Sequence, residues 1–180
     1  HQGIEPKATV RALYHVAAPW SLAAEVEIRA LAEAIAIRLR EELREGLGGT
    51  YGVRVRGTLA RRPTGLATIE LEFGCAPDRV EALLKAAQAE LAALRKRGPS
   101  AAVLQKIKET WKRQRQVDTQ TNRYWIDALV DDVYPNHDEP KTIVAVDPLI
   151  AGLTTAKLKA AAQRYLGKDV VIGVLSPAAK

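Results

Sequence analysis

The sequence is poor in several residue types, and each shortage excludes a class of protein. It contains no methionine and a single cysteine, Cys75, so the chain cannot form an internal disulfide bond or a cluster of cysteine metal ligands. No run approaches the roughly 18 apolar residues of a membrane span, and the first residues lack the charged-then-apolar pattern of a signal peptide. We therefore expect a chain without a membrane segment. Because its first residue is not methionine, we also expect a fragment or processed product of a longer protein.

Residues for self-contained catalysis are also missing. The three histidines are His1, His15 and His137, and none stands at metal-ligand spacing from another His, Cys or Glu. The sequence has no Gly-x-Ser-x-Gly elbow, phosphate-binding loop or dinucleotide fingerprint. The adjacent carboxylates Glu41 and Glu42 are interpreted as solvated charge, because neighbouring helix residues point in different directions. The sequence therefore predicts no complete active site.

What the sequence does have is an ordinary globular composition, with 47% hydrophobic and 27% charged residues, and clear periodic patterns. Some stretches alternate or run apolar as strands do, and others repeat apolar residues at helical spacing. The resulting order is strand, helix, strand, strand, helix, long helix, helix, strand. We predict a single α+β domain over residues 1–180, a two-layer sandwich of an antiparallel-rich mixed sheet with helices packed on one face.

The expected elements follow from these patterns and from their caps and turns. The predicted strands are Thr9–Ala17, Thr50–Leu59, a third over Ala67–Phe73, and Val170–Leu175, whose continuous apolar run is typical of a central strand. The predicted helices run from Ser21 to about Glu45, from the capping box Asp78/Glu81 to Arg97, from Ser100 as one long helix or two with a kink, and from Thr154 to Gly167. Tyr134–Pro140 is predicted as a loop, and Thr142–Ile150 is weakly patterned.

A turn centred on Pro63 joins the second and third strands and sets their register. With that turn, apolar residues of the two strands face one another on the inside, and opposite charges face one another on the outside. A one-residue slip would invert every side chain, so the agreement of both faces specifies the pairing. The predicted opposite pairs are Val53–Phe73, Arg54–Glu72, Val55–Leu71 and Arg56–Glu70.

The bend Leu43–Gly52 (LREGLGGTYG) joins the first helix to the second strand and is the most informative part of the chain. It places Arg44 seven residues ahead of Tyr51, and strand alternation predicts Tyr51 on the same face as Val53 and Val55. Its glycines follow the C-terminal end of a helix, where carbonyls are exposed, so a phosphate-binding loop is excluded. We expect the bend to aim the polar tips of Arg44 and Tyr51 at one place.

The net charge of +6 and a basic run on the long helix permit an acidic partner such as nucleic acid. The run spreads around the helix instead of lining one stripe, Glu109 interrupts it, and the neighbouring Trp111 belongs to the apolar stripe. Nucleic acid is therefore the disfavoured partner. The basic residues are Lys106, Lys108, Lys112, Arg113 and Arg115.

The run Leu43–Val53 resembles the arginine-and-tyrosine segment in the C-terminal half of pitrilysin- and insulinase-like zinc peptidases, especially bacterial periplasmic-type members. Two further pieces agree with that family: Gly3–Ala8 (GIEPKA) ahead of the first strand, and Asn122–Trp125 (NRYW) in the long helix. The element order also looks like one of the family's repeated α+β units, so the resemblance covers nearly the whole chain.

The resemblance implies a function and assigns residues to it. In that family the zinc motif His-x-x-Glu-His lies in the N-terminal half, and two halves close around a peptide. By residue match, Arg44 and Tyr51 are the pair that the C-terminal half directs at the substrate. Arg40, in the near-copy Leu39–Glu42 (LREE), is the rival arginine, and the seven-residue step to Tyr51 favours Arg44.

The resemblance thus implies a non-catalytic domain with no cofactor of its own, zinc being held elsewhere in the parent enzyme. Its implied partners are the N-terminal catalytic half and a peptide substrate, in the periplasm or cell envelope. A domain of this fold can instead be retained for assembly without proteolysis, as in core subunits of respiratory complexes, and a basic nucleic-acid-binding module is the third alternative. For the two site residues, the alternatives are a helix-end salt bridge for Arg44 and an aromatic at the edge of the core for Tyr51.

Overall fold

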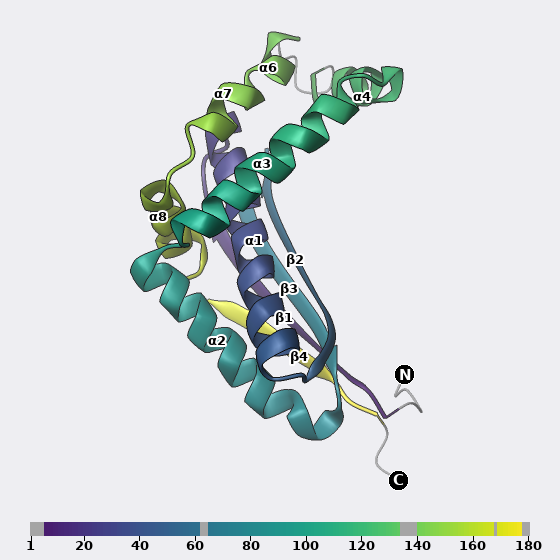
Figure 1. Ribbon diagram of the computed structural model, residues 1–180, viewed down its shortest axis with the longest axis vertical. Coiled ribbons are helices and arrows are strands. Elements are labelled where there is room, and N and C mark those ends of the chain that lie inside the picture. The colour runs from purple at the N-terminus through teal and green to yellow at the C-terminus, as the bar shows by residue number, and fades with distance from the viewer. Residues whose placement is uncertain (1–5, 62–64, 134–139, 168, 178–180) are drawn as a thin grey trace.

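The computed structural model describes residues 6–61, 65–133, 140–167 and 169–177, and within them four strands form one antiparallel sheet (Figure 1). The strands are β1 (Ala8–Ala17), β2 (Thr50–Ala60), β3 (Leu66–Cys75) and β4 (Val170–Leu175). Their order across the sheet is β2-β3-β1-β4. Each of the three pairings is antiparallel.

Side-chain caps begin three of the helices where the sequence predicts them. In each, a hydroxyl oxygen accepts a hydrogen bond from the backbone N–H three residues on. The caps are Ser21, Ser100 and Thr154. The helices are α1 (Leu22–Leu39), α2 (Val80–Arg97), α3 (Ala101–Asp118), α4 (Asn122–Asp127), α6 (Lys141–Val144), α7 (Val146–Ala151) and α8 (Thr155–Tyr165), with π-helical η1 (Arg40–Gly46) and η3 (Ala128–Val133) and the 3-10 turn η2 (Pro77–Arg79).

Helices α1, α2 and α8 pack on one face of the sheet, which confirms the predicted α+β architecture (Figure 1). The inward residues of β1 and β3 are buried against these helices, among them Val10, Ile69 and Phe73. Burying a side chain of this size typically contributes about 1.5–3 kcal/mol. Cys75, at the end of β3, is buried, and its burial raises the pKa of the thiol.

Helix α1 is buried on two sides, although its sequence shows one clear apolar stripe. Ile28 and Leu31 pack in the core shared with the sheet. Val26, Ala30 and Ala34 pack in a second core with residues of α3, α7 and α8. Helices α3 and α7 therefore lie outside α1, and α1 is enclosed between them and the sheet.

The predicted hairpin register is confirmed at all four pairs, and of the two expected charge pairs the described residues show Arg54–Glu72 as a long ion pair and no contact for Arg56–Glu70. Arg11 of β1 takes both glutamates: its Nε donates to Glu72 Oε2 (3.0 Å) and lies 3.1 Å from Glu70 Oε1, and its Nη2 also bonds Glu72. The hydrogen bond to Glu72 is the main cause of a raised Arg11 pKa. Arg54 comes no closer to Glu72 than 4.0 Å. The glutamates of β3 thus lie closer to Arg11 of β1 than to the arginines of β2.

Two other expectations are corrected. Strand β4 is an edge strand and not a central one, since β1 is its sole neighbour among the described strands. Its Val171 and Leu175 are 60% and 57% exposed. Asp78 and Glu81 form no capping box, because the turn η2 precedes α2 and places Arg79 at the N-cap without a side-chain hydrogen bond.

The region after Ser100 shows which alternative holds for the long helix. Helix α3 ends at Asp118, and Thr121 caps a separate helix, α4, so the two-helix alternative is confirmed. The weakly patterned Thr142–Ile150 is largely helical, in α6 and α7. The predicted loop Tyr134–Pro140 lies outside the described residues except for Pro140, as does the centre of the turn at 62–64.

Candidate functional site

Arg44 lies in η1, the π-helical continuation of α1. Its neighbour Leu43 is fully buried in the core beneath α1, which anchors the turn. Arg44 and the rival Arg40 are both exposed, and neither guanidinium makes a hydrogen bond or ion pair within the described residues. The helix-end salt bridge considered for Arg44 therefore does not form there. π-helical turns are rare and are frequent at functional sites.

Backbone hydrogen bonds close the bend between η1 and β2. The N–H of Leu47 donates to Glu42 O (2.9 Å), and the N–H of Gly49 donates to Leu43 O (3.1 Å). Gly48 has a φ of 59°, the left-handed region that favours glycine after a helix. The bend therefore has the C-terminal polarity that the sequence predicts, and the carbonyls of Glu42 and Leu43 accept hydrogen bonds within it.

Tyr51 sits at a β-bulge, and this corrects its predicted orientation. The β2–β3 ladder is irregular between Thr50 and Gly52, which leaves Tyr51 as an extra residue without a partner. A Cβ built on Gly74, on the helix-free face of β3, would lie 3.9 Å from Tyr51 Cδ2. The ring therefore lies over the helix-free face, opposite the face of Val53. It is 69% exposed, so it is not an aromatic at the edge of the core.

Thr50 holds the bulge in place. Its Oγ1 donates to Gly74 O (2.7 Å) and accepts from the N–H of Gly52 (3.2 Å). Lys7 Nζ lies 5.7 Å from the centroid of the Tyr51 ring, within the range of a cation–π contact. The ring is thus supported by neighbours while most of its surface faces solvent.

The two predicted site residues come from adjoining segments, because η1 packs against β2. Both side chains are exposed, and the described residues show no hydrogen bond or ring contact between Arg44 and Tyr51. A guanidinium and a phenol are both hydrogen-bond donors. The arrangement therefore exposes two separate hydrogen-bond donors, one on η1 and one at the start of β2.

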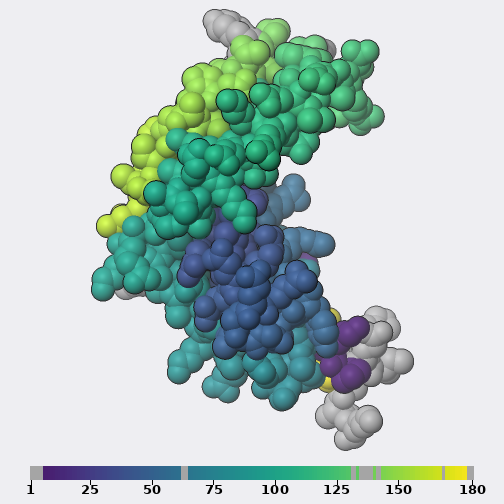
Figure 2. All heavy atoms as spheres, in the orientation of Figure 1, coloured from purple at the N-terminus to yellow at the C-terminus, as the bar shows by residue number. Residues whose placement is uncertain are grey.

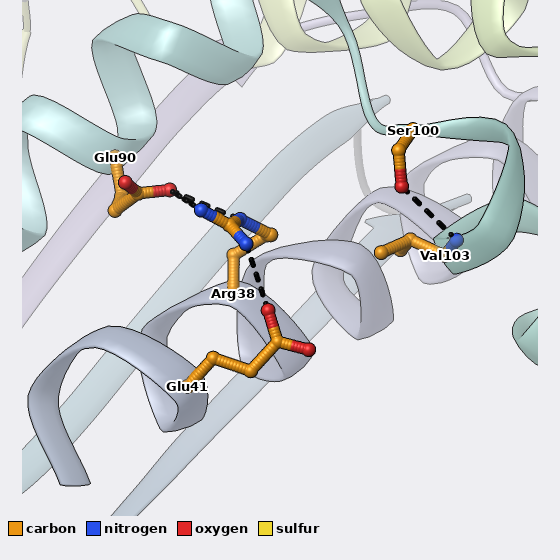
Figure 3. A network of polar contacts seen from close by, with 5 residues as sticks. All are labelled: Arg38, Glu41, Glu90, Ser100 and Val103. Atoms are coloured by element: carbon orange, nitrogen blue, oxygen red, sulfur yellow. Dashed lines mark hydrogen bonds and ion pairs between the residues drawn. The ribbon is translucent and has the colours of Figure 1, made fainter. Parts of the chain in front are cut away.

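An ion-pair network just before η1 ties α1 to α2 (Figure 3). Arg38 donates through Nε and Nη2 to Glu90 Oε2, both at 3.1 Å, and through Nη1 to Glu41 Oε2 at 2.8 Å. Partial burial opposes the charge of Arg38, but the two carboxylates outweigh it and raise the arginine pKa. Glu41 is thus paired and not merely solvated. The network fixes the helix end from which Arg44 projects.

The remaining candidates for chemistry are few. Within the part of the chain that the structure describes, no three His, Cys, Asp or Glu residues gather as a metal site. His15 is exposed on β1, and His1 and His137 fall outside the described ranges. In those same ranges, no helix is long and apolar enough to cross a membrane.

A family model described as the peptidase M16 inactive domain matches residues 12–110. The chain belongs to this family. The match confirms the resemblance to pitrilysin- and insulinase-like peptidases that the run Leu43–Val53 indicates. No curated protein matches the chain significantly.

Solved structures of proteases share the fold of this M16 inactive domain. The periplasmic protease PqqL of Escherichia coli has a TM-score of 0.83 at 23% identity, over 97% of this chain and 19% of that one. The ferredoxin protease FusC, solved with Arabidopsis ferredoxin, has a TM-score of 0.81 at 19% identity, over 98% of this chain and 19% of that one. A putative zinc protease of Bordetella pertussis has a TM-score of 0.77 at 20% identity, over 98% of each chain.

The structure of this chain also contains a groove that the sequence analysis did not predict. Two cavities of about 500 and 790 Å³ share walls from α1, β2 and α3, including Arg29, Leu59 and Trp111. Arginines stack on its aromatic rings: Arg61 Cζ lies 3.9 Å from the Trp20 centroid, and Arg29 Cζ lies 5.7 Å from that of Trp111. These partners are far apart in sequence, so no local motif marks the groove.

The basic run on α3 is partly occupied with structural contacts. Lys108 Nζ donates to Ala151 O (2.7 Å). Arg115 bonds both carboxylate oxygens of Asp147 and donates to Tyr124 Oη (2.8 Å). These two cations join α3 to α4 and α7. The nucleic-acid alternative therefore gains no support from the arrangement.

Proposed function

We propose that residues 1–180 form one non-catalytic domain of a longer zinc endopeptidase, which closes the cleft over a peptide substrate. The match to the peptidase M16 inactive domain carries this proposal. A structural neighbour that is a ferredoxin protease was solved with ferredoxin, which supports a peptide or protein as the ligand. The proposal assigns the zinc and its His-x-x-Glu-His motif to a separate N-terminal half, the domain's other partner.

Arg44 and Tyr51 are the residues we assign to substrate contact. Both are exposed at the junction of η1 and β2, and the Arg44 guanidinium has no partner among the described residues. Donors of this kind can hold a substrate carbonyl or stabilise the negative oxygen that develops as the carbonyl is attacked. Hydrogen bonds in the bend and at the bulge hold the backbone on either side of these two residues. The Arg44 guanidinium and the Tyr51 hydroxyl take no part in those bonds.

Kinetics of the full-length parent peptidase test this assignment. Arg44→Ala or Tyr51→Phe should each lower kcat/KM by about 100-fold, the usual cost of losing one such donor. Their free energies of unfolding should stay within about 0.5 kcal/mol of wild type, because both side chains are exposed. Arg40→Ala is the matched control, an exposed arginine on the same turn, and should retain full activity.

Two results would contradict the proposal in different ways. Unchanged kcat/KM in both variants, with unchanged stability, removes the roles of Arg44 and Tyr51. Stoichiometric zinc uptake and peptide cleavage by the 180-residue chain alone contradict the non-catalytic role itself.

A structural, assembly role is the second candidate, and one observation favours it. The edge strand β4 exposes Val171 and Leu175 on one face and Val174 on the other, apolar side chains suited to a protein neighbour. The two candidates differ in the upstream sequence of the parent: the peptidase role requires His-x-x-Glu-His there, and the assembly role does not.

A further inference from the structure

The outer edge of β2 has no neighbouring strand among the described residues. Among the described strands, β2 pairs with β3 alone, so its other side presents unpaired backbone N–H and C=O groups. The cavity of about 500 Å³ follows this strand over Val55–Ala60, beneath Trp111 of α3. Figure 2 shows the molecule hollowed on this side, below the arm of α3 and α4. There is space beside β2 for another extended chain.

The charges on β2 are of one sign. No Asp or Glu occurs between Gly46 and Ile69, whereas Arg54 and Arg56 both point to the helix-free face. Because Arg11 takes both glutamates of β3, Arg54 keeps one contact at 4.0 Å with its side chain 84% exposed. Arg56 has no hydrogen bond or ion pair within the described residues. The edge strand therefore offers two cations that lack full partners.

These cations determine what kind of strand fits the edge. Antiparallel pairing of β2 with a second β2 centred on Val55 would set Arg54 opposite Arg56, and like charges directly opposite destabilise a sheet. An added strand with carboxylates two residues apart matches the spacing of about 6.6 Å between Arg54 and Arg56. Charge complementarity thus selects an acidic extended segment and disfavours a second copy of the chain.

We propose that an acidic, extended segment of the peptide substrate adds to the sheet beside β2, with alternate carboxylates on Arg54 and Arg56. This deepens the proposed function and rests on it. Tyr51 lies on the same helix-free face at the start of the strand. Alternate side chains of a peptide paired with β2 would therefore lie on the same face as Tyr51, Arg54 and Arg56. The peptide backbone would be held by the main-chain hydrogen bonds typical of strand addition.

Binding of labelled peptides to the 180-residue chain tests the proposal by fluorescence anisotropy. The probes are Thr-Val-Glu-Val-Glu-Val-Thr, its Gln-x-Gln counterpart, and a Glu-x-Glu form that is N-methylated at alternate residues. Two cross-strand charge pairs should make the Glu peptide bind about tenfold more tightly than the Gln peptide. The N-methylated peptide should lose binding, because it cannot donate to the strand edge.

Double variants distinguish two roles for the arginines: binding a peptide, or only preventing aggregation at the strand edge. Arg54→Gln with Arg56→Gln should erase the tenfold preference, while Arg113→Gln with Arg97→Gln, exposed helix arginines, should leave it intact. Equal affinity for the Glu and Gln peptides contradicts the proposal and indicates that the arginines only prevent edge-to-edge aggregation. Undiminished binding of the N-methylated peptide contradicts strand addition, and so does the absence of binding by any probe.

Turnover by the parent peptidase distinguishes this inference from the function on which it rests. Arg54→Gln with Arg56→Gln should raise KM for acidic substrates about tenfold and leave kcat unchanged. If Arg44→Ala lowers turnover and the β2 pair does not change KM, the edge inference alone is wrong. If acidic peptides bind β2 but Arg44→Ala and Tyr51→Phe leave turnover intact, the assigned contacts are wrong.

Discussion

The two edges of the sheet have opposite surfaces. Strand β2 is 11 residues long, carries a bulge, and exposes Arg54 and Arg56 without a nearby carboxylate to neutralise them fully. Strand β4 is six residues long and exposes Val171, Val174 and Leu175. One edge is long and cationic, whereas the other is short and apolar.

This difference indicates that the two edges suit different neighbours. Cations on an edge strand prevent pairing with similar chains but accept a strand that brings carboxylates. Exposed apolar side chains gain most from burial against another protein surface. Under the proposed function, β2 is the edge for the substrate and β4 the edge for another part of a larger protein.

The strongest test of this comparison is one substitution made on each edge. A Cβ at Gly57 of β2 would lie 2.5 Å from Ile28 O of α1, whereas a Cβ at Gly173 of β4 meets no atom within 4 Å. Gly57→Ala should therefore lower the free energy of unfolding by about 2 kcal/mol, because α1 must shift away from the strand. Gly173→Ala should change it by less than about 0.5 kcal/mol. Urea unfolding of both variants measures the difference, and equal values would show that α1 does not hold β2 as described.

The bulge at the start of β2 is the subject of a smaller prediction. Thr50→Val removes the hydroxyl that bonds Gly74 O and the N–H of Gly52, and should cost about 1 kcal/mol of stability. Thr58→Val is the matched control on the same strand, since the described residues give its hydroxyl no hydrogen bond. The same urea titration measures both variants. A loss at Thr58 as large as that at Thr50 would mean that the bulge hydrogen bonds contribute nothing specific.

The smallest expected change in stability is at the apolar edge. Val171→Lys should alter the free energy of unfolding by less than about 0.5 kcal/mol, because the side chain is 60% exposed. It should nevertheless reduce self-association in sedimentation velocity, since a lysine on an edge strand opposes pairing. Arg54→Val on β2 should increase self-association. If both variants sediment as the wild type does, the two edges do not differ in the way proposed.

Much of the fold could be predicted because its signals are local. Three hydroxyl caps, the two-residue alternation of β3 and the register of the hairpin all depend on residues close together in sequence. The prediction of a capping box at Asp78 and Glu81 was wrong although the motif is local, because the chain enters α2 through a 3-10 turn. Local patterns therefore predicted the elements better than their ends.

The errors that matter for the site depend on distant neighbours. Arg11 forms ion pairs with Glu70 and Glu72 because β1 lies beside β3. The spacing of residues within the β2–β3 hairpin contains no information about that third strand. The apolar run of β4 looks the same in sequence whether one or two strands flank it. The bulge is equally hidden, since Tyr51 continues the alternation of β2 and only the structure shows that it is skipped. Arg44 and Tyr51 stay a prediction as substrate contacts.

The bulge at Tyr51 has a consequence for variation among relatives of this chain. A residue outside the ladder and largely exposed contributes little to pairing or to the core, so the fold imposes almost no selection on its identity. Val53, two positions on, must stay apolar because it packs against the core. If relatives keep tyrosine at position 51 while the surrounding surface residues vary, the tyrosine is under selection for the contacts of its side chain and not for the fold of the domain.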